Sequence, residues 1–249
     1  MSIVLNEREF AENALETCSL GQKPLETLGR IARYYAADGY KRADIHALLE
    51  GFLLKCDPGA NIVKWQNAID QQVKYACKNR LIEIDSIPIT QKELDTCESL
   101  PGTQMRRLLF TLICLAKFSD AVNPRNDGWV NRQDKEIFKM ANIVTPVKRQ
   151  SLMLHDLREL GLIRFSRKVD NVNIKVQCID AAGGAVLHVS DFRSLGYQFL
   201  RYQGEPYFEC EGCGLVIRRT NNSQMYCRAC HIEMNRQKCR ENWRQNAAG

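Results

Sequence analysis

The chain has 249 residues, of which 45% are hydrophobic and 26% are charged, and its formal net charge is +6. These globular proportions exclude collagen-like, disordered and coiled-coil chains, and the length suits one large domain or two to three small ones. No apolar run approaches the roughly 20 residues of a membrane span, and the opening residues lack the pattern of a signal peptide. We therefore expect a cytoplasmic protein whose eleven cysteines are metal ligands or buried hydrophobes, not disulfides.

The charge is unevenly distributed along the chain. Residues 1–100 contain 12 Lys and Arg against 15 Asp and Glu, residues 101–209 contain 16 against 11, and residues 210–249 contain 7 against 3. A basic stretch beside an acidic one suggests an anionic partner for the basic part, although solvated helix faces would give the same pattern. We divide the chain into a helical region (1–100), a central domain with a C-terminal extension (101–203) and a small C-terminal module (204–249).

The first hundred residues are predicted to form a helical bundle, and they contain no catalytic constellation. Asn6 is expected to cap the first helix, and turn signals such as Asp57-Pro58-Gly59 separate the later ones. A short strand is predicted at 81–84. By apolar periodicity, the helices are expected at about 7–18, 25–37, 42–55, 62–78 and 91–100.

The middle of the chain has a recognisable order of elements. A nearly all-apolar helix over 105–117 is followed by a polar loop (120–127) and by a short strand at Trp129-Val130. Asn131 is expected to cap a helix over 132–141, and Thr145-Pro146 to begin a further helix that ends at Gly161. Two strands are predicted to follow, over 162–167 and 172–179.

Helix, strand, helix, helix and two-stranded hairpin is an order that resembles the winged-helix family of helix-turn-helix domains. The resemblance implies that the third helix enters the major groove of DNA and that the hairpin contacts the backbone. When the third helix is projected at 100° per residue, its core side carries Val147, Gln150, Met153, Leu154, Leu157 and Leu160. The outer side carries Lys148, Ser151, Leu152, His155 and Glu159, with Arg158 at the border.

The predicted DNA contacts of this domain are Lys148, Ser151, His155 and Arg158 on the helix and Arg164, Arg167 and Lys168 in the hairpin. Glu159 on the same face would repel phosphate. A winged helix used for protein contact or dimerisation remains an alternative. After the hairpin, we expect a strand over 185–189 and a helix over 192–202 that packs on the central domain.

The C-terminal module contains two CxxC pairs, Cys210-x₂-Cys213 and Cys227-x₂-Cys230. Two such pairs indicate one tetrahedral Zn²⁺ site, because each turn brings two sulfurs within Zn–S bonding distance of one ion. Four thiolates fill the coordination sphere, so the zinc is expected to be structural. A dithiol redox site needs one CxxC and does not explain two. The remaining cysteines are scattered, and Cys239 falls on the helix expected after Cys230.

With the second pair at the start of that helix, the module resembles a treble clef or zinc ribbon. Four thiolates and Zn²⁺ lower its net charge from +4 to about +2, so its basic residues must act by position. The basic residues could bind nucleic acid together with Trp243, or the module could bind a protein. These predicted contacts are Arg218, Arg219, Arg228, Arg236, Lys238, Arg240 and Arg244. The histidines do not form the pattern of an HNH nuclease, so no enzyme activity is expected.

From about residue 80 onward, the chain resembles uncharacterised proteins carried by phages and prophages of Gram-positive bacteria. The stretches that carry this resemblance are Trp129-Val130-Asn131, Leu157–Ile163, Tyr207–Cys210 and Tyr226-Cys227. It implies a bacterial cytoplasm and a phage task such as replication or transcriptional control.

The sequence thus predicts a mostly α (α+β) protein with one structural Zn²⁺ that binds DNA or RNA, in a regulatory or replicative role. The alternative is a phage effector that binds and inhibits or redirects a host protein, such as RNA polymerase or a defence nuclease of the CRISPR type. A homodimer is compatible with either.

Overall fold

The computed structural model describes residues 3–166 and 173–247, with the side chains of 244–247 also left undescribed. The fold is mostly helical with small antiparallel sheets, as the sequence predicts. The chain divides into two compact units, Met1–Asp85 and Ser86–Gly249. The predicted first region, 1–100, therefore runs past the first unit, and the predicted regions 101–203 and 204–249 both fall within the second.

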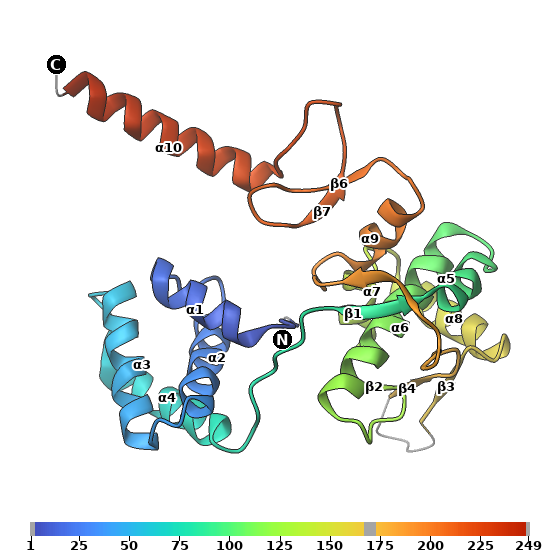
Figure 1. The fold of residues 1–249 in the computed structure, drawn as a ribbon, viewed down its shortest axis with the longest axis horizontal. Helices are drawn as coiled ribbons and strands as arrows, with labels where there is room; N and C mark the ends of the chain where they lie inside the picture. Colours follow the sequence, from blue (N-terminus) through green and yellow to red (C-terminus); the bar gives the residue numbers. More distant parts are fainter. Residues whose placement is uncertain (1–2, 167–172, 248–249) are drawn as a thin grey trace. The chain divides into compact units, whose positions relative to one another are not determined.

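The first unit is a bundle of helices around an apolar core. Its core side chains include Leu28, Ile31, Leu49 and Ile69, each fully buried. The Asn6 side chain accepts a hydrogen bond from Glu9 N at 3.1 Å, so the predicted cap is confirmed. The helices of this unit are α1 (Glu7–Thr17), α2 (Pro24–Ala37), α3 (Arg42–Cys56) and α4 (Ile62–Ala76) (Figure 1).

The predicted strand at 81–84 is wrong, because this segment forms a single bridge instead of a sheet. Glu83 bridges Asn6, and Glu7 N donates to Ile82 O at 2.7 Å. The Glu7 carboxylate is buried and accepts from both Arg33 and Ile82 N. The segment 81–84 is therefore attached to the start of α1 by the buried Glu7 carboxylate and by backbone hydrogen bonds.

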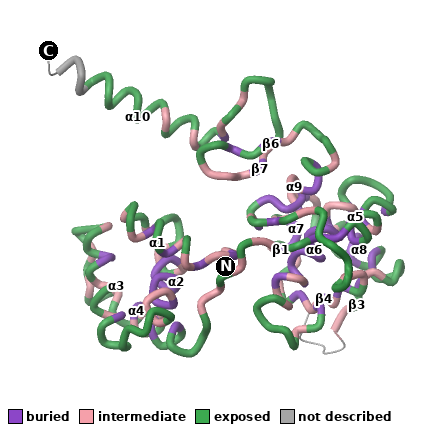
Figure 2. The backbone as a smooth tube through the Cα atoms, viewed as in Figure 1, coloured by how far each residue is buried: buried purple, intermediate pink, exposed green. Residues whose placement is uncertain are grey.

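The second unit is built around α6 (Thr103–Val122), whose residues from Leu108 to Ala116 are all buried. Figure 2 shows the buried backbone of this unit gathered at α6. The helices around it are α5 (Gln91–Glu98), α7 (Asp134–Met140), α8 (Val147–Glu159) and α9 (Leu195–Tyr202). The ring of Phe199 on α9 lies 5.1 Å from that of Phe110, so the predicted packing of this helix on the central domain is confirmed.

Three short strands form one antiparallel sheet in the order β2-β4-β3. They are β2 (Trp129–Val130), β3 (Ile163–Phe165) and β4 (Ile174–Val176). Val130 pairs with Ile174, and Ile163 pairs with Val176, and all four side chains are buried. The sheet therefore joins a strand before α7 to the two strands after α8.

Several predicted helix boundaries in this unit are wrong. Asn131 does not cap α7, which begins at Asp134 after Gln133, and α8 begins at Val147 without a side-chain cap from Thr145. The later helix begins at Leu195 instead of 192. The predicted end of α8 is confirmed, because Gly161 adopts φ +71° and Leu162 N donates to Leu157 O at 3.0 Å.

A strand that the sequence pattern did not predict, β1 (Ile87–Thr90), pairs antiparallel with β5 (Ala185–Val189). The buried Glu93 joins the segment after β1 to α6 and to the chain before β5. Its carboxylate completes a capping box with Thr90, pairs with Lys117 Nζ at 2.9 Å and accepts from Asp180 N at 3.0 Å. Residues 86–100 thus belong with α6 and not with the N-terminal helices.

Candidate metal centre and nucleic-acid interface

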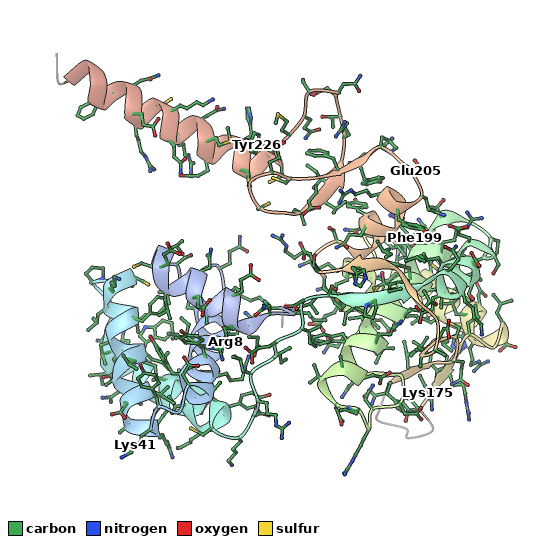
Figure 3. All side chains as sticks on the ribbon, viewed as in Figure 1. Arg8, Lys41, Lys175, Phe199, Glu205 and Tyr226 are labelled. Atoms are coloured by element: carbon green, nitrogen blue, oxygen red, sulfur yellow. The ribbon has the colours of Figure 1, made fainter. Side chains whose placement is uncertain are left out.

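The four paired cysteines come from two elements at the end of the chain. Cys210 and Cys213 lie in the turn between β6 (Tyr207–Glu209) and β7 (Val216–Arg218). Cys227 directly precedes α10 (Arg228–Ala247), and Cys230 lies in its first turn. Figure 3 places Tyr226 where the loop after the hairpin meets α10. The two pairs, with 13 residues between them in the sequence, therefore meet at one point.

The four sulfur atoms lie within 4.8 Å of one another. Cys213 Sγ and Cys227 Sγ are 3.8 Å apart. A tetrahedral ion with metal–sulfur bonds of about 2.3 Å places its sulfurs about 3.8 Å apart. The group could therefore hold one metal ion, and the prediction that these four cysteines lie together is confirmed.

Two glycines permit the tight turn that carries the first pair. Gly214 adopts φ +70°, a conformation that other residues rarely adopt, and its N–H donates to Cys210 O at 2.8 Å. A Cβ atom on Gly212 would lie 3.1 Å from both Cβ and Sγ of Cys230. The absence of a side chain at Gly212 thus gives the second pair room to approach the first.

Backbone donors surround the buried sulfur of Cys210. Burial raises the pKa of its thiol, but backbone N–H groups, including that of Cys227 at 3.1 Å, outweigh burial and lower the pKa to about 6. The neighbouring sulfurs of Cys227 and Cys213 raise the pKa of Cys230 to about 12. Since like charges this close resist forming together, a bound cation is what would let all four sulfurs act as thiolates.

The hairpin docks on α9 through polar and aromatic contacts that the sequence did not reveal. Arg193 Nη2 donates to Cys213 O at 2.5 Å, and Arg193 is also paired with Asp191 at 2.6 Å. The rings of Tyr197 and Tyr207 lie 4.8 Å apart. These contacts attach the cysteine turn to the helix that packs on α6, and no spacing or motif in the sequence signals them.

The exposed face of α8 carries the predicted contact residues Lys148, Ser151, His155 and Arg158. Met153, Leu154 and Leu157 are buried as predicted, and Gln150 is half-buried. The predictions of Val147 and Leu160 as core residues are wrong, since they are 76% and 56% exposed. Both lie at an end of α8, where the periodic stripe runs beyond the packed region.

Phe165 of β3 joins two of these residues to the hairpin. The ring of His155 lies 5.2 Å from that of Phe165 in an edge-to-face arrangement, and the Arg158 guanidinium lies 5.8 Å over the same ring. Arg158 also pairs with Glu159 at 2.5 Å. Glu159 thus partly neutralises Arg158 at one border of the face, while Lys148 lies exposed on the face itself.

Two of the predicted hairpin contacts, Arg167 and Lys168, lie outside the described residues. Arg164 on β3 is exposed. Lys175 on β4, labelled in Figure 3, pairs with Asp127. In the described part of the hairpin, Arg164 is thus the predicted cation that the structure leaves exposed beside α8.

The predicted basic contacts of the C-terminal module are exposed wherever their side chains are described. Arg219 lies with its guanidinium 5.2 Å over the ring of Phe208, and Arg236 lies 3.7 Å from Glu233. Arg244 lies in α10, but its side chain is outside the described set. The exposed members are Arg218, Arg219, Arg228, Arg236, Lys238 and Arg240.

Across residues 3–166 and 173–243, no second group of three or more His, Cys, Asp or Glu side chains is placed to hold a metal ion. His231, next to Cys230, is exposed, and its backbone N–H donates to Cys227 O at 2.9 Å. Among the described helices, none combines the length and apolar character that crossing a bilayer requires. Comparisons with protein-family models, curated proteins and solved structures found no match to this chain.

Proposed function

We propose that this protein is a zinc-containing, nucleic-acid-binding protein with a regulatory or replication-associated role. In this proposal, α8 and the β3–β4 hairpin contact duplex DNA, and the basic C-terminal module adds a second contact surface. Bacterial phage origin and a cytoplasmic location remain predictions from the sequence.

The observation that carries the DNA proposal is the topology around α8. The order α6, β2, α7, α8, β3, β4, with strand order β2-β4-β3, supports interpreting this region as a winged helix. In that arrangement α8 is the helix that reads the major groove. Its outer face presents Lys148, Ser151 and His155, which suit phosphates and base edges.

The metal proposal is carried by the donor set. Four sulfurs within 4.8 Å of one another favour Zn²⁺ over the hard cations, which prefer oxygen ligands. A knuckle after β6 and a second pair at the start of α10 support a treble-clef-like module. Because all four positions are protein sulfurs, the ion would stabilise the fold and leave no site for substrate.

The test is duplex binding across a salt series with the full-length, zinc-loaded protein. Binding should weaken steeply as salt rises, because neutralised phosphates release counterions. Lys148→Ala should weaken binding and reduce the salt slope by about 1. Lys64→Ala, an exposed lysine on α4, is the matched control and should change neither. Absence of DNA and RNA binding at about 50 mM salt would refute the proposal.

One observation favours a protein partner as the second candidate. Val144 and Val147 are 98% and 76% exposed, and Leu152 on the outer face of α8 is 46% exposed. Exposed apolar side chains also suit a protein contact, as expected of an effector that binds a host protein. A stoichiometric protein captured from nuclease-treated bacterial lysate, and lost in Val147→Ser, would favour this candidate over DNA.

A further inference from the structure

The helix α10 is the least covered element of the second unit. Its described side chains, from Arg228 to Trp243, are all exposed except Cys230 and Met234, which are half-buried. Figure 2 shows most of the described part of the helix in the colour of exposed residues. Such a helix has no apolar face packed in the described structure, so its polar and basic surface is open to a partner.

One face of α10 combines two cations with an aromatic ring. Arg236, Arg240 and Trp243 are spaced four and three residues apart, so they lie on the same side of the helix. Trp243 is 73% exposed. At 1.5 Å per residue, Arg236 and Trp243 are about 10 Å apart along the axis. We call these three residues the arginine–tryptophan face.

The charges around this face fit an anionic partner. Glu233 is the acid closest to it, and its carboxylate lies 3.7 Å from Arg236 with both side chains more than half exposed, which makes a weak pair. Glu241 precedes Trp243 by two residues and so lies near the opposite side of the helix. The arginine–tryptophan face is therefore positive, and it also carries an exposed indole. An anionic partner that offers a flat surface could contact both the cations and the indole.

We propose, on the basis of the nucleic-acid-binding function above, that the arginine–tryptophan face binds single-stranded nucleic acid. Trp243 stacks on an unpaired base, while Arg236 and Arg240 contact the phosphates beside it. Bases in a single strand expose their flat faces, and an aromatic ring flanked by cations is how sequence-tolerant single-strand sites hold them. Bases within a duplex are covered on both faces by their neighbours, so the indole has no equivalent contact there.

The test is fluorescence anisotropy of the full-length, zinc-loaded protein with labelled oligo(dT) and with a blunt duplex of the same length. Trp243→Leu keeps an apolar side chain but removes the ring. It should weaken oligo(dT) binding about tenfold, the loss expected for one base stack, and change duplex affinity less than twofold. Trp243→Phe keeps a ring and should retain most of the single-strand affinity.

Arg240→Ala and Lys238→Ala form the matched charge comparison. Lys238 is exposed on the same helix but lies away from the arginine–tryptophan face, so Arg240→Ala should cost more oligo(dT) affinity than Lys238→Ala. Equal losses on oligo(dT) and duplex in Trp243→Leu, or no loss on oligo(dT), would overturn the inference. If one of these contrary results is found while the duplex still binds with its dependence on Lys148 intact, only this inference fails. If neither probe binds, the proposed function fails with it.

Discussion

The region 86–203 and the cysteine module 204–249 are stabilised in different ways. The first buries large apolar side chains around α6, among them Phe110, Phe138 and Phe199. Between residues 204 and 243 the buried side chains are Phe208, Cys210, Val216 and Cys227. So small an apolar core cannot by itself offset the entropy of ordering the chain, and a metal ion would supply the difference.

The two regions are nevertheless joined through α9. This helix contacts α6 through Phe199 and the hairpin through Tyr197, while Arg193 just before it donates to the carbonyl of Cys213. The cysteine module should therefore depend on metal and the region 86–203 on packing, and α9 is the helix that contacts both. Three substitutions test this division.

The largest effect is expected from Cys210→Ser. Loss of one sulfur should remove most of the metal-binding free energy of the module, on the order of 10 kcal/mol. Metal analysis should find about one zinc per wild-type chain and far less in the variant, and limited proteolysis should cut within 204–249 while 86–203 persists. Cys239→Ser, at an exposed position outside the cluster, should keep its zinc. A module that stays protease-resistant without metal would contradict the division.

A smaller effect, on the other region, is expected from Leu157→Ala. Leu157 is fully buried on α8, so the cavity should lower the free energy of unfolding of the second unit by about 2–5 kcal/mol. Leu152→Ala, at a 46% exposed position on the same helix, should change it by less than about 0.5 kcal/mol. Chemical denaturation measures both. Zinc content should be unchanged in each, and zinc loss in Leu157→Ala would mean that the two regions are not separable.

The smallest of the three effects is expected at the connecting helix, from Gly196→Ala. The added Cβ would collide with the backbone carbonyl of Ala141, which cannot move as a flexible side chain would. The cost should be about 1–3 kcal/mol. Gly184→Ala, where a Cβ meets nothing within 4 Å, is the control. Unfolding should become less cooperative between the two regions, and a two-state transition of unchanged midpoint would argue against α9 as their link.

Much of the candidate metal centre could be predicted from the sequence, and less of the interface. The CxxC spacing fixes the sulfurs locally, because a tight turn of four residues leaves few backbone conformations. The buried stripe of α8 also follows from periodicity at Met153, Leu154 and Leu157. The burial predicted from periodicity is wrong at Val147 and Leu160, because the apolar pattern continues at both ends of the helix past the part that packs against the core.

The sequence by itself determined that four cysteines converge on one site, that helices dominate, and that the helix α8 carries its basic residues outward. These features depend on neighbours within a few residues. Only the tertiary structure decided that β1 pairs with β5, that Glu93 is buried against Lys117, and that Arg193 holds the turn of Cys213. Each of these contacts joins segments far apart in the chain, and the choice among such partners is made by packing and burial that no local pattern encodes.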